Sequence, residues 1–178
     1  MNPPLRVLVV TTSLNPQSKS RILARKTADV LEEEGAEVDW VDLQEHPLPF
    51  CDGNNSNKTP EALALRKKVE EADGILLAAP IYNYDVNAAA KNFVELTGRA
   101  WTQKVVAIAV AAGGQRSGMS PMGLVNSLML DFRCIVLPRF VYASRSEFEG
   151  LVPNPATVER VEELSHELLR VSSALRVL

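Results

Sequence analysis

The sequence lacks most of the features that mark secreted, membrane-bound or nucleic-acid-binding proteins. Its two cysteines, Cys51 and Cys134, are far apart and lack metal-ligand spacing, so we expect free thiols in a reducing compartment. The net charge is −3 and no basic cluster stands out, which argues against nucleic acid and anionic membranes as partners. No apolar run reaches the length of a membrane span, and the first strand leaves no room for a signal peptide. These absences predict a cytoplasmic protein.

Several catalytic and nucleotide-binding motifs are missing as well. There is no G-x-S-x-G nucleophile elbow, and the two histidines are isolated, which disfavours a hydrolase. The loop after the first strand contains neither the G-x-G-x-x-G of dinucleotide sites nor the G-x-x-x-x-G-K-[ST] of triphosphate loops. That strand ends in Thr11 and Thr12, without the acidic cluster of a phospho-acceptor module. The function must therefore be sought in the residues that these loops do contain.

Strands and helices alternate along the chain. With 178 residues and 46% hydrophobic content, the sequence predicts a single domain over residues 1–178 with a sizeable core. Unbroken apolar runs such as 73–79 and 104–112 predict strands that are buried on both faces. This alternation predicts one parallel sheet with helices on both faces. Strands are expected at 5–10, 37–43, 73–79, 104–112 and 134–141 around Pro138, and helices at 21–34, 60–72, 86–96, 121–131 and 155–177.

Three loops of unusual composition follow strands of this predicted sheet. They cover residues 12–20, 80–85 and 113–118. Ligands of such sheets bind at the carboxyl ends of the strands, near the switch point of the topology. The three loops should therefore become neighbours around one ligand, a conclusion that no single loop would support.

The first loop is rich in hydroxyl donors. It carries Thr12, Ser13, Ser18 and Ser20 together with the ammonium of Lys19, and a helical pattern follows near Arg21. Free N–H groups and the positive end of the dipole make a helix start a ready anion site. Hydroxyls there suit a terminal monophosphate such as that of flavin mononucleotide (FMN). The alternative is a polar loop in which Ser18 or Ser20 merely caps the helix.

Motifs in all three loops resemble those of one known family. The chain reads T-S-L-N-P-Q-S-K-S from Thr12, P-I-Y-N at residues 80–83, and a glycine pair with a following arginine at residues 113–116. An L-P-x-x-D segment at 48–52 and a K-N-x-x-E pattern at 91–95 add to the likeness. The sequence thus resembles the NADPH-dependent FMN reductases, flavodoxin-like proteins that include quinone, azo-dye and chromate reductases.

The resemblance implies a fold, a cofactor and a set of contacts. The fold would be a flavodoxin-like, doubly wound α/β sheet of five parallel strands in the order 2-1-3-4-5. FMN would be the cofactor and NAD(P)H the co-substrate. The cofactor-binding residues would be Ser13, Asn15, Ser18, Lys19 and Ser20 around the phosphate, Pro80, Ile81, Tyr82 and Asn83 along the isoalloxazine, Gly113 and Gly114 on its other side, and Arg116 at its pyrimidine edge or at a pyridine-nucleotide phosphate.

Two departures from the family pattern bear on specificity. Asn15 stands where the family usually has an arginine, and Lys19 is the candidate substitute, although an ammonium is not a bidentate fork. The preference between NADPH and NADH is therefore open. Tyr84 and Asp85 replace small residues after P-I-Y-N. We expect a ring and a carboxylate there to narrow the flavin face or repel anionic acceptors.

The resemblance also implies a reaction that needs no catalytic side chain, because the flavin carries the redox chemistry. Electrons would pass from the nicotinamide to a flavin, quinone, azo dye or metal oxyanion by ping-pong kinetics. A homodimer or homotetramer is expected, with the helix at Val86–Leu96 as candidate interface unless its apolar residues face the sheet. A non-enzymatic, flavodoxin-like electron carrier and a ligand-free interaction module on the same fold remain the alternatives.

Overall fold

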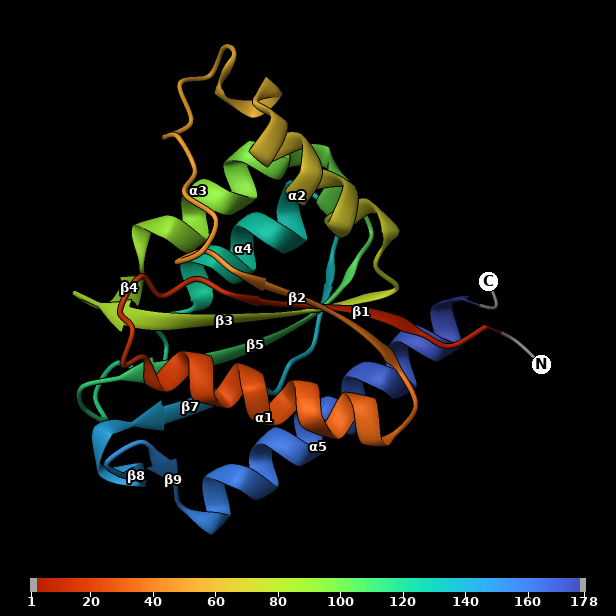
Figure 1. Cartoon of the computed structure of the whole chain (residues 1–178). Coiled ribbons are helices and arrows are strands. Elements are labelled where there is room, and N and C mark those ends of the chain that lie inside the picture. Colours follow the sequence, from red (N-terminus) through yellow and green to blue (C-terminus); the bar gives the residue numbers. More distant parts are fainter. Residues whose placement is uncertain (1–2, 177–178) are drawn as a thin grey trace.

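A seven-stranded sheet with helices on both faces forms the core of the protein. The computed structural model describes residues 3–176 (Figure 1). Helices α2, α3 and α4 cover one face of the sheet, while α1 and α5 cover the other (Figure 1). The helices are α1 (Lys19–Glu33), α2 (Pro60–Glu71), α3 (Ala88–Thr97), α4 (Met122–Leu130) and α5 (Pro155–Arg176). Within residues 3–176, no helix combines the length and apolar character that crossing a bilayer requires.

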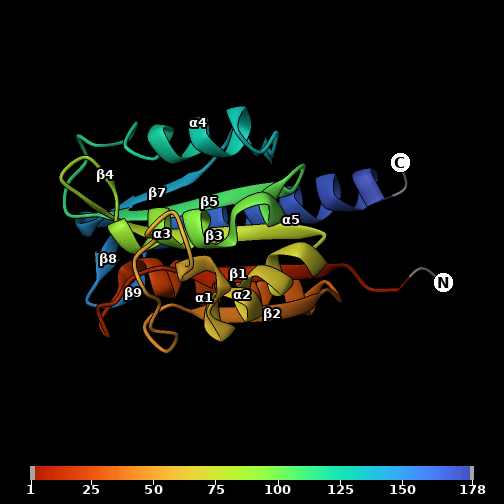
Figure 2. The ribbon, with the colours of Figure 1, turned by 90° about the horizontal axis from the view of Figure 1, so that it is seen from above.

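The main strands lie in the predicted order. β1 (Arg6–Thr11) pairs in parallel with β2 (Glu37–Asp42) and with β3 (Gly74–Tyr82). β3 pairs with β5 (Val105–Ala112), which in turn pairs with β6 (Ile135–Val136) and β7 (Val141–Ser144). Figure 2 shows this sequence of neighbours from β2 to β7. The order is 2-1-3-4-5 when β6 and β7 count as one strand and the short antiparallel β4 (Asp85–Val86) is left out, so the flavodoxin-like prediction is confirmed with small differences in strand count.

The last strand is divided because Pro138 has no N–H to donate to a ladder. β6 ends at Val136, and pairing with β5 resumes only at Val141. A separate two-stranded hairpin follows, formed by β8 (Phe148–Glu149) and β9 (Val152–Pro153). This hairpin lies beside the carboxyl ends of the strands, close to the start of α1 (Figure 1).

Helix boundaries follow the capping residues of the sequence. The Oγ of Ser18 accepts a hydrogen bond from the Arg21 N–H at 3.3 Å, so α1 begins at Lys19, two residues before the predicted start. Of the two predicted caps, Ser18 is therefore the one used. Thr59 caps α2 in the same way, as its side chain accepts from the Ala62 N–H at 3.3 Å. Short 3₁₀ turns lie at Ser56–Lys58, Gly98–Trp101 and Arg145–Glu147.

The segment expected to be a loop at residues 80–85 is instead a β-hairpin. β3 continues to Tyr82, and β4 (Asp85–Val86) folds back antiparallel, with Tyr82 opposite Asp85. Asn83 and Tyr84 form the turn with positive φ angles of 51° and 68°, the backbone of a two-residue type I′ turn. Pro80 is tolerated inside β3 because the ladder with β1 ends at Ala78, before the proline.

Candidate functional site

A cavity of about 230 Å³ lies at the carboxyl ends of the strands, where the predicted loops meet. Eight of the twelve predicted cofactor-binding residues line it, and Gln17, Ala111, Ala112 and Arg145 complete the wall. We call this cavity the cradle. The predicted residues in its wall are Ser13, Asn15, Ser18, Lys19, Ser20, Pro80, Tyr82 and Gly113.

Four predicted residues lie outside the cradle wall. Side chains alternate along β3, so Pro80 and Tyr82 line the cradle while Ile81, 8% exposed, packs into the core. Asn83 occupies the exposed hairpin turn. The carbonyl of Gly114 accepts from the Tyr142 hydroxyl, and Arg116 is exposed beyond it. The sequence motif thus extends further than the cavity wall does.

Some hydroxyl groups of the cradle donate no hydrogen bond within residues 3–176. Ser13, Ser18 and Ser20 are at most 6% exposed. The Oγ atoms of Ser18 and Ser20 lie 2.9 Å apart, so one hydroxyl donates to the other, while the Oγ of Ser13 only accepts, from the Asn15 N–H at 3.3 Å. Two hydroxyl protons therefore have no acceptor within residues 3–176. The N–H groups in the first turn of α1 also lack intrahelical acceptors, so the cradle is a cluster of donors.

The guanidinium of Arg21 connects the cradle loop to the end of β2. Its Nε and Nη2 bind the carboxylate of Asp42 at 2.5 and 3.1 Å, a bidentate pair between α1 and the end of β2. The same guanidinium donates to the carbonyls of Ser13 at 2.9 Å and Asn15 at 2.6 Å. Two chain segments thus converge on one planar group. In the sequence Arg21 marks only the start of a helix, and no local pattern indicates this role.

Thr12 and Asn87 join the first loop to the start of α3. The Thr12 hydroxyl donates to the Asn87 Oδ1 at 2.7 Å, and the Asn87 amide donates to the Thr12 carbonyl at 2.7 Å. Both residues are buried, and they are 75 positions apart in the chain. Thr12 is therefore occupied in the structure itself, while the serines of the same loop keep free protons.

Arg145 lines the cradle and belongs to a turn that hydrogen bonds and an ion pair stabilise. It follows β7 directly and opens the 3₁₀ turn Arg145–Glu147. Glu147 accepts from the Ser144 N–H at 2.7 Å and pairs with Arg160. Partial burial raises the pKa of Glu147, but the Ser144 bonds and the Arg160 charge outweigh it and lower the pKa overall. The loop after β7, which Arg145 begins, also lies at the carboxyl end of a parallel strand. The rule that selected the other three loops therefore applies to it as well.

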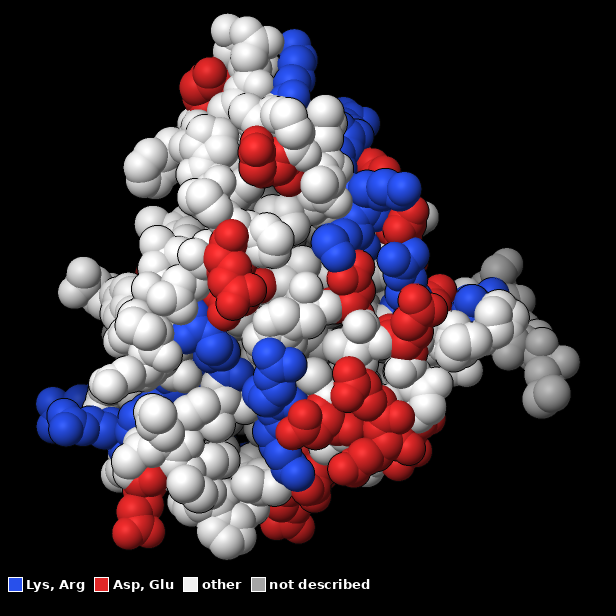
Figure 3. All heavy atoms as spheres, in the orientation of Figure 1, with Lys and Arg blue, Asp and Glu red and all other residues white. Residues whose placement is uncertain are grey.

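Lys19 lines the cradle and also contacts the β8–β9 hairpin. Its Nζ lies 4.6 Å from the centroid of the Phe148 ring, a cation–π contact with the β8–β9 hairpin. Its side chain and that of Arg145 make no ion pair with a carboxylate in the part of the chain that is described. Figure 3 shows basic side chains gathered at this edge of the molecule. The cradle wall itself contains no acidic residue.

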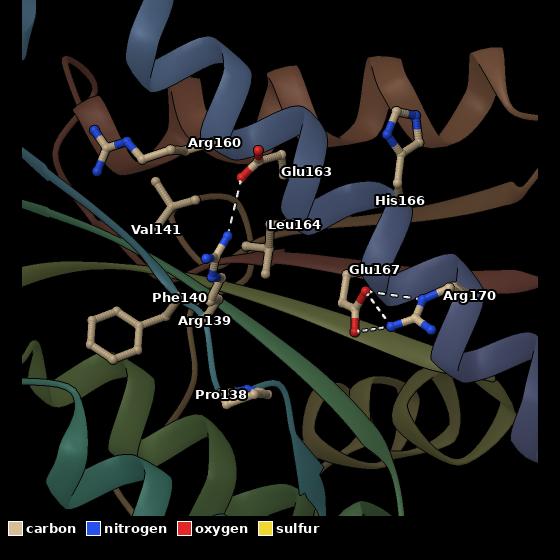
Figure 4. A pocket seen from close by; sticks show the side chains of 10 residues that line it. All are labelled: Pro138, Arg139, Phe140, Val141, Arg160, Glu163, Leu164, His166, Glu167 and Arg170. Carbon is tan, nitrogen blue, oxygen red and sulfur yellow. Dashed lines mark hydrogen bonds and ion pairs between the residues drawn. The ribbon is translucent and has the colours of Figure 1, made fainter.

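A larger cavity, of about 710 Å³, lies elsewhere, between α5 and the strand edge around Pro138 (Figure 4). We call it the α5 groove. Phe140, Val141 and Leu164 give it an apolar floor. Its cations are paired, because Arg139 lies 3.7 Å from Glu163 and Arg170 lies 2.6 Å from Glu167. None of the predicted cofactor-binding residues lines it.

The chain matches known proteins along most of its length. The model of the family described as NADPH-dependent FMN reductase matches residues 5–148. An NAD(P)H:quinone oxidoreductase of Solanum tuberosum is 33% identical, with 89% of this chain and 88% of that protein covered. An NADPH:quinone oxidoreductase of Arabidopsis thaliana is 30% identical, with 92% and 90% covered.

A solved structure extends the likeness to the fold. The flavoenzyme NAD(P)H:(acceptor) oxidoreductase FerB of Paracoccus denitrificans superimposes with a TM-score of 0.78 at 19% identity, covering 96% of this chain and 98% of that one. Together with the family match and the plant relatives, this confirms an FMN-dependent NAD(P)H oxidoreductase. The chain therefore belongs to the NADPH-dependent FMN reductase family.

Proposed function

We propose that the cradle holds the phosphate and ribityl chain of FMN and that the ring lies along Pro80 and Tyr82. The observation that carries this proposal is the surplus of donors, because a phosphate offers only acceptors to the hydroxyls of Ser13, Ser18 and Ser20. Arg145 and the start of α1 add positive potential. The residues present therefore fit the phosphate of FMN.

The ring end of the site has open space and one exposed aromatic. Tyr82 is 53% exposed and lines the cradle. A Cβ built on Gly113 or Gly114 would meet no protein atom within 4 Å, so the protein itself does not demand glycine at either position. Close approach of a flat ring would demand it. Arg116, exposed beyond the cradle, stays our candidate contact for the pyrimidine edge or a nucleotide phosphate.

Bound FMN supplies the redox chemistry, and the protein supplies binding and orientation. We propose a quinone as the electron acceptor, since the two plant relatives are quinone oxidoreductases. The open side of the cradle leaves one space for both the nicotinamide and the acceptor, which must occupy it in turn. Steady-state rates should therefore give the parallel reciprocal plots of ping-pong kinetics.

Anaerobic stopped-flow mixing tests this proposal directly. The protein loaded with FMN should bleach within milliseconds to seconds on mixing with NADPH or NADH, and a quinone should then restore the yellow colour. Comparing the two donors also reveals which one is preferred. Slow bleaching by both donors would indicate an electron carrier, and failure to retain FMN would contradict the assignment of the cradle.

Tyr84 and Asp85 are our candidates for acceptor selection. Tyr84 is 59% exposed at the tip of the β3–β4 hairpin, with a φ of 68° that disfavours a bulky residue. Asp85 accepts from the Val86 N–H at 2.7 Å and lies near Gly123 at the start of α4. We expect Tyr84→Gly to admit larger acceptors and Asp85→Ser to admit more anionic ones. Unchanged relative kcat/KM values across an acceptor series would contradict this.

We propose that the protein is a homodimer or homotetramer that buries the apolar rim beside α3. The apolar residues Phe93, Val94 and Leu96 of α3 are buried in the core, so the helix alone offers little apolar surface. Leu14 and Phe50, 59% and 82% exposed, instead line a pocket with the first turn of α3. Light scattering of wild type and of Phe50→Glu tests this, since only the variant should be monomeric.

The free thiols of Cys51 and Cys134 fit our proposal of a cytoplasmic location.

A further inference from the structure

The loop after β5 begins with two glycines and has little support from its own main chain. Gly113 lines the cradle, and Gly114 follows it at an exposed position. A Cβ on either would meet no atom within 4 Å, so close packing does not hold this backbone in place. The main-chain N–H groups of residues 114–116 donate no hydrogen bond in the described part of the chain. Because glycine allows the widest range of backbone angles, such a loop needs support from another element.

Tyr142 supplies that support. It belongs to β7, which runs beside β5 (Figure 1). Its hydroxyl donates to the Gly114 carbonyl, and the same oxygen lies 2.8 Å from the Ser117 Oγ. A phenol has one proton, and the carbonyl accepts it, so the Ser117 hydroxyl must donate to Tyr142. One hydroxyl group thus connects both ends of residues 114–117 to the neighbouring strand.

The loop has one further side-chain hydrogen bond to a distant segment, and that bond is weaker. The Gln115 Nε2 donates to the Ser146 Oγ at 3.3 Å, where both side chains are exposed. An exposed bond of this length restrains a loop poorly, because water competes for both groups. Tyr142 is therefore the main tether of the loop.

The tether also sets the direction of a free donor. No peptide bond in residues 3–176 is cis, and in a trans peptide the C=O and the following N–H point in opposite directions. The Gly114 carbonyl is turned to Tyr142, so the Gln115 N–H points away from Tyr142. That N–H has no acceptor within the described residues. Tyr142 itself does not line the cradle.

We propose that Tyr142 is a positioning residue for the flavin: by holding Gly114, it directs the Gln115 N–H toward the ring of FMN. This proposal rests on the assignment of the cradle to FMN. A donor beside the ring stabilises its reduced form more than its oxidised form, because reduction adds electron density to the ring. Tyr142 thus raises the reduction potential of bound FMN without contacting it.

The test compares Tyr142→Phe with wild type in flavin titrations and in potentiometry of the FMN-loaded protein. The substitution removes one hydroxyl and keeps the aromatic ring. FMN and riboflavin should lose affinity by the same factor, because the loop faces the ring that both share. Reduced FMN should be weakened about tenfold more than oxidised FMN, which lowers the two-electron potential by about 30 mV. Ser117→Ala should shift it less, since the bond from Tyr142 to Gly114 is retained.

Thr97→Val is the matched control. The Thr97 hydroxyl also makes two close bonds, donating to the Phe93 carbonyl at 2.6 Å and accepting from the Trp101 Nε1 at 2.7 Å. It is buried at the end of α3 and does not line the cradle. Its loss should lower stability, as the loss of the Tyr142 hydroxyl does, and leave the potential of bound FMN unchanged.

The outcomes separate this proposal from the function on which it rests. A wild type that retains no flavin would overturn both. Flavin bound by wild type, with the same potential in Tyr142→Phe, would overturn the role of Tyr142 alone. An equal shift in Thr97→Val would trace the effect to lost stability, and a loss of affinity for FMN but not for riboflavin would trace it to the phosphate. Either result would refute the proposal, as would a larger shift in Ser117→Ala than in Tyr142→Phe.

Discussion

The cradle is smaller than the α5 groove, but it has more polar groups without partners. The groove, at about 710 Å³, is the larger, but Arg139 and Arg170 already have carboxylate partners there. The cradle, at about 230 Å³, has no acidic residue in its wall and contains serine protons without acceptors. A cavity whose polar groups satisfy one another gains little from a ligand, whereas unsatisfied donors gain a great deal. Unmet hydrogen-bonding capacity, more than volume, therefore makes the cradle the better candidate for a binding site.

Among variants that compare the cradle with the α5 groove, Arg21→Met should have the largest effect on stability. The change leaves the carboxylate of Asp42, 5% exposed, without its bidentate partner and releases the carbonyls of the cradle loop. We expect a loss of about 3 kcal/mol of unfolding free energy in urea titrations, together with a weaker FMN complex. Arg139→Met in the α5 groove is the control, since that side chain is 90% exposed and should cost almost nothing. Equal destabilisation by the two variants would break the comparison.

Ser20→Ala is expected to have the next largest effect, on affinity and not on folding. Removing one hydroxyl that faces the phosphate should weaken FMN about tenfold, the lower end for hydrogen bonds to charged groups. Riboflavin, which has no phosphate, should bind wild type and variant alike in the same titrations. Ser18→Ala should lose about 1 kcal/mol of stability in addition, because Ser18 is also the N-cap of α1. A parallel loss for riboflavin would mean that the serines shape the loop and do not contact the phosphate.

A smaller difference should appear in the response to salt. Arg145 has no carboxylate partner in the described chain, so its attraction for a phosphate is screened as ionic strength rises. The FMN dissociation constant of wild type should increase severalfold between low and high salt, and Arg145→Gln should flatten that dependence. Arg170→Gln, taken from an ion pair in the α5 groove, should keep the wild-type slope. Identical slopes in all three proteins would remove Arg145 from the phosphate environment.

The smallest expected effect is a pH dependence of stability that comes from Glu147. Its pKa is lower in the folded protein than the ordinary value of 4.5, so its contribution is present above pH 4.5. That contribution is lost as the pH falls through the folded pKa. Glu147→Gln should therefore destabilise the protein by about 1 kcal/mol at pH 7, and the gap from wild type should shrink below pH 4.5. Thermal melts at several pH values would measure the gap, and a constant difference would contradict the role of the ionised carboxylate.

The sequence was sufficient to predict the topology and the edge of the sheet at which the cradle lies. Buried strands such as β5 are unbroken apolar runs, and capping residues such as Thr59 mark helix starts, so local chemistry predicted the order of elements. The rule for parallel sheets then predicted that three loops meet at one edge, and the cradle lies there. Contact with a cofactor remains a prediction for every residue in the cradle wall.

The rest depended on interactions that no local pattern encodes. The hairpin at residues 80–85 pairs Tyr82 with Asp85. Its turn was not recognisable from the sequence, because turn residues with positive φ are usually Asn or Gly and here include Tyr84. Ile81 belongs to the matched motif and yet faces the core, because strand alternation turns every second side chain away. The parts played by Arg21 and Arg145 depend on partners or neighbours that only the folded chain supplies.

The reciprocal bonds between Thr12 and Asn87 have a consequence for the order of events during folding. They close a loop of 75 positions, and contacts between residues so distant in the chain form late and slowly. Competence to capture flavin must then lag behind the growth of helical signal when denaturant is diluted. A refolding experiment followed by circular dichroism and by quenching of flavin emission would show that delay as two separate time courses.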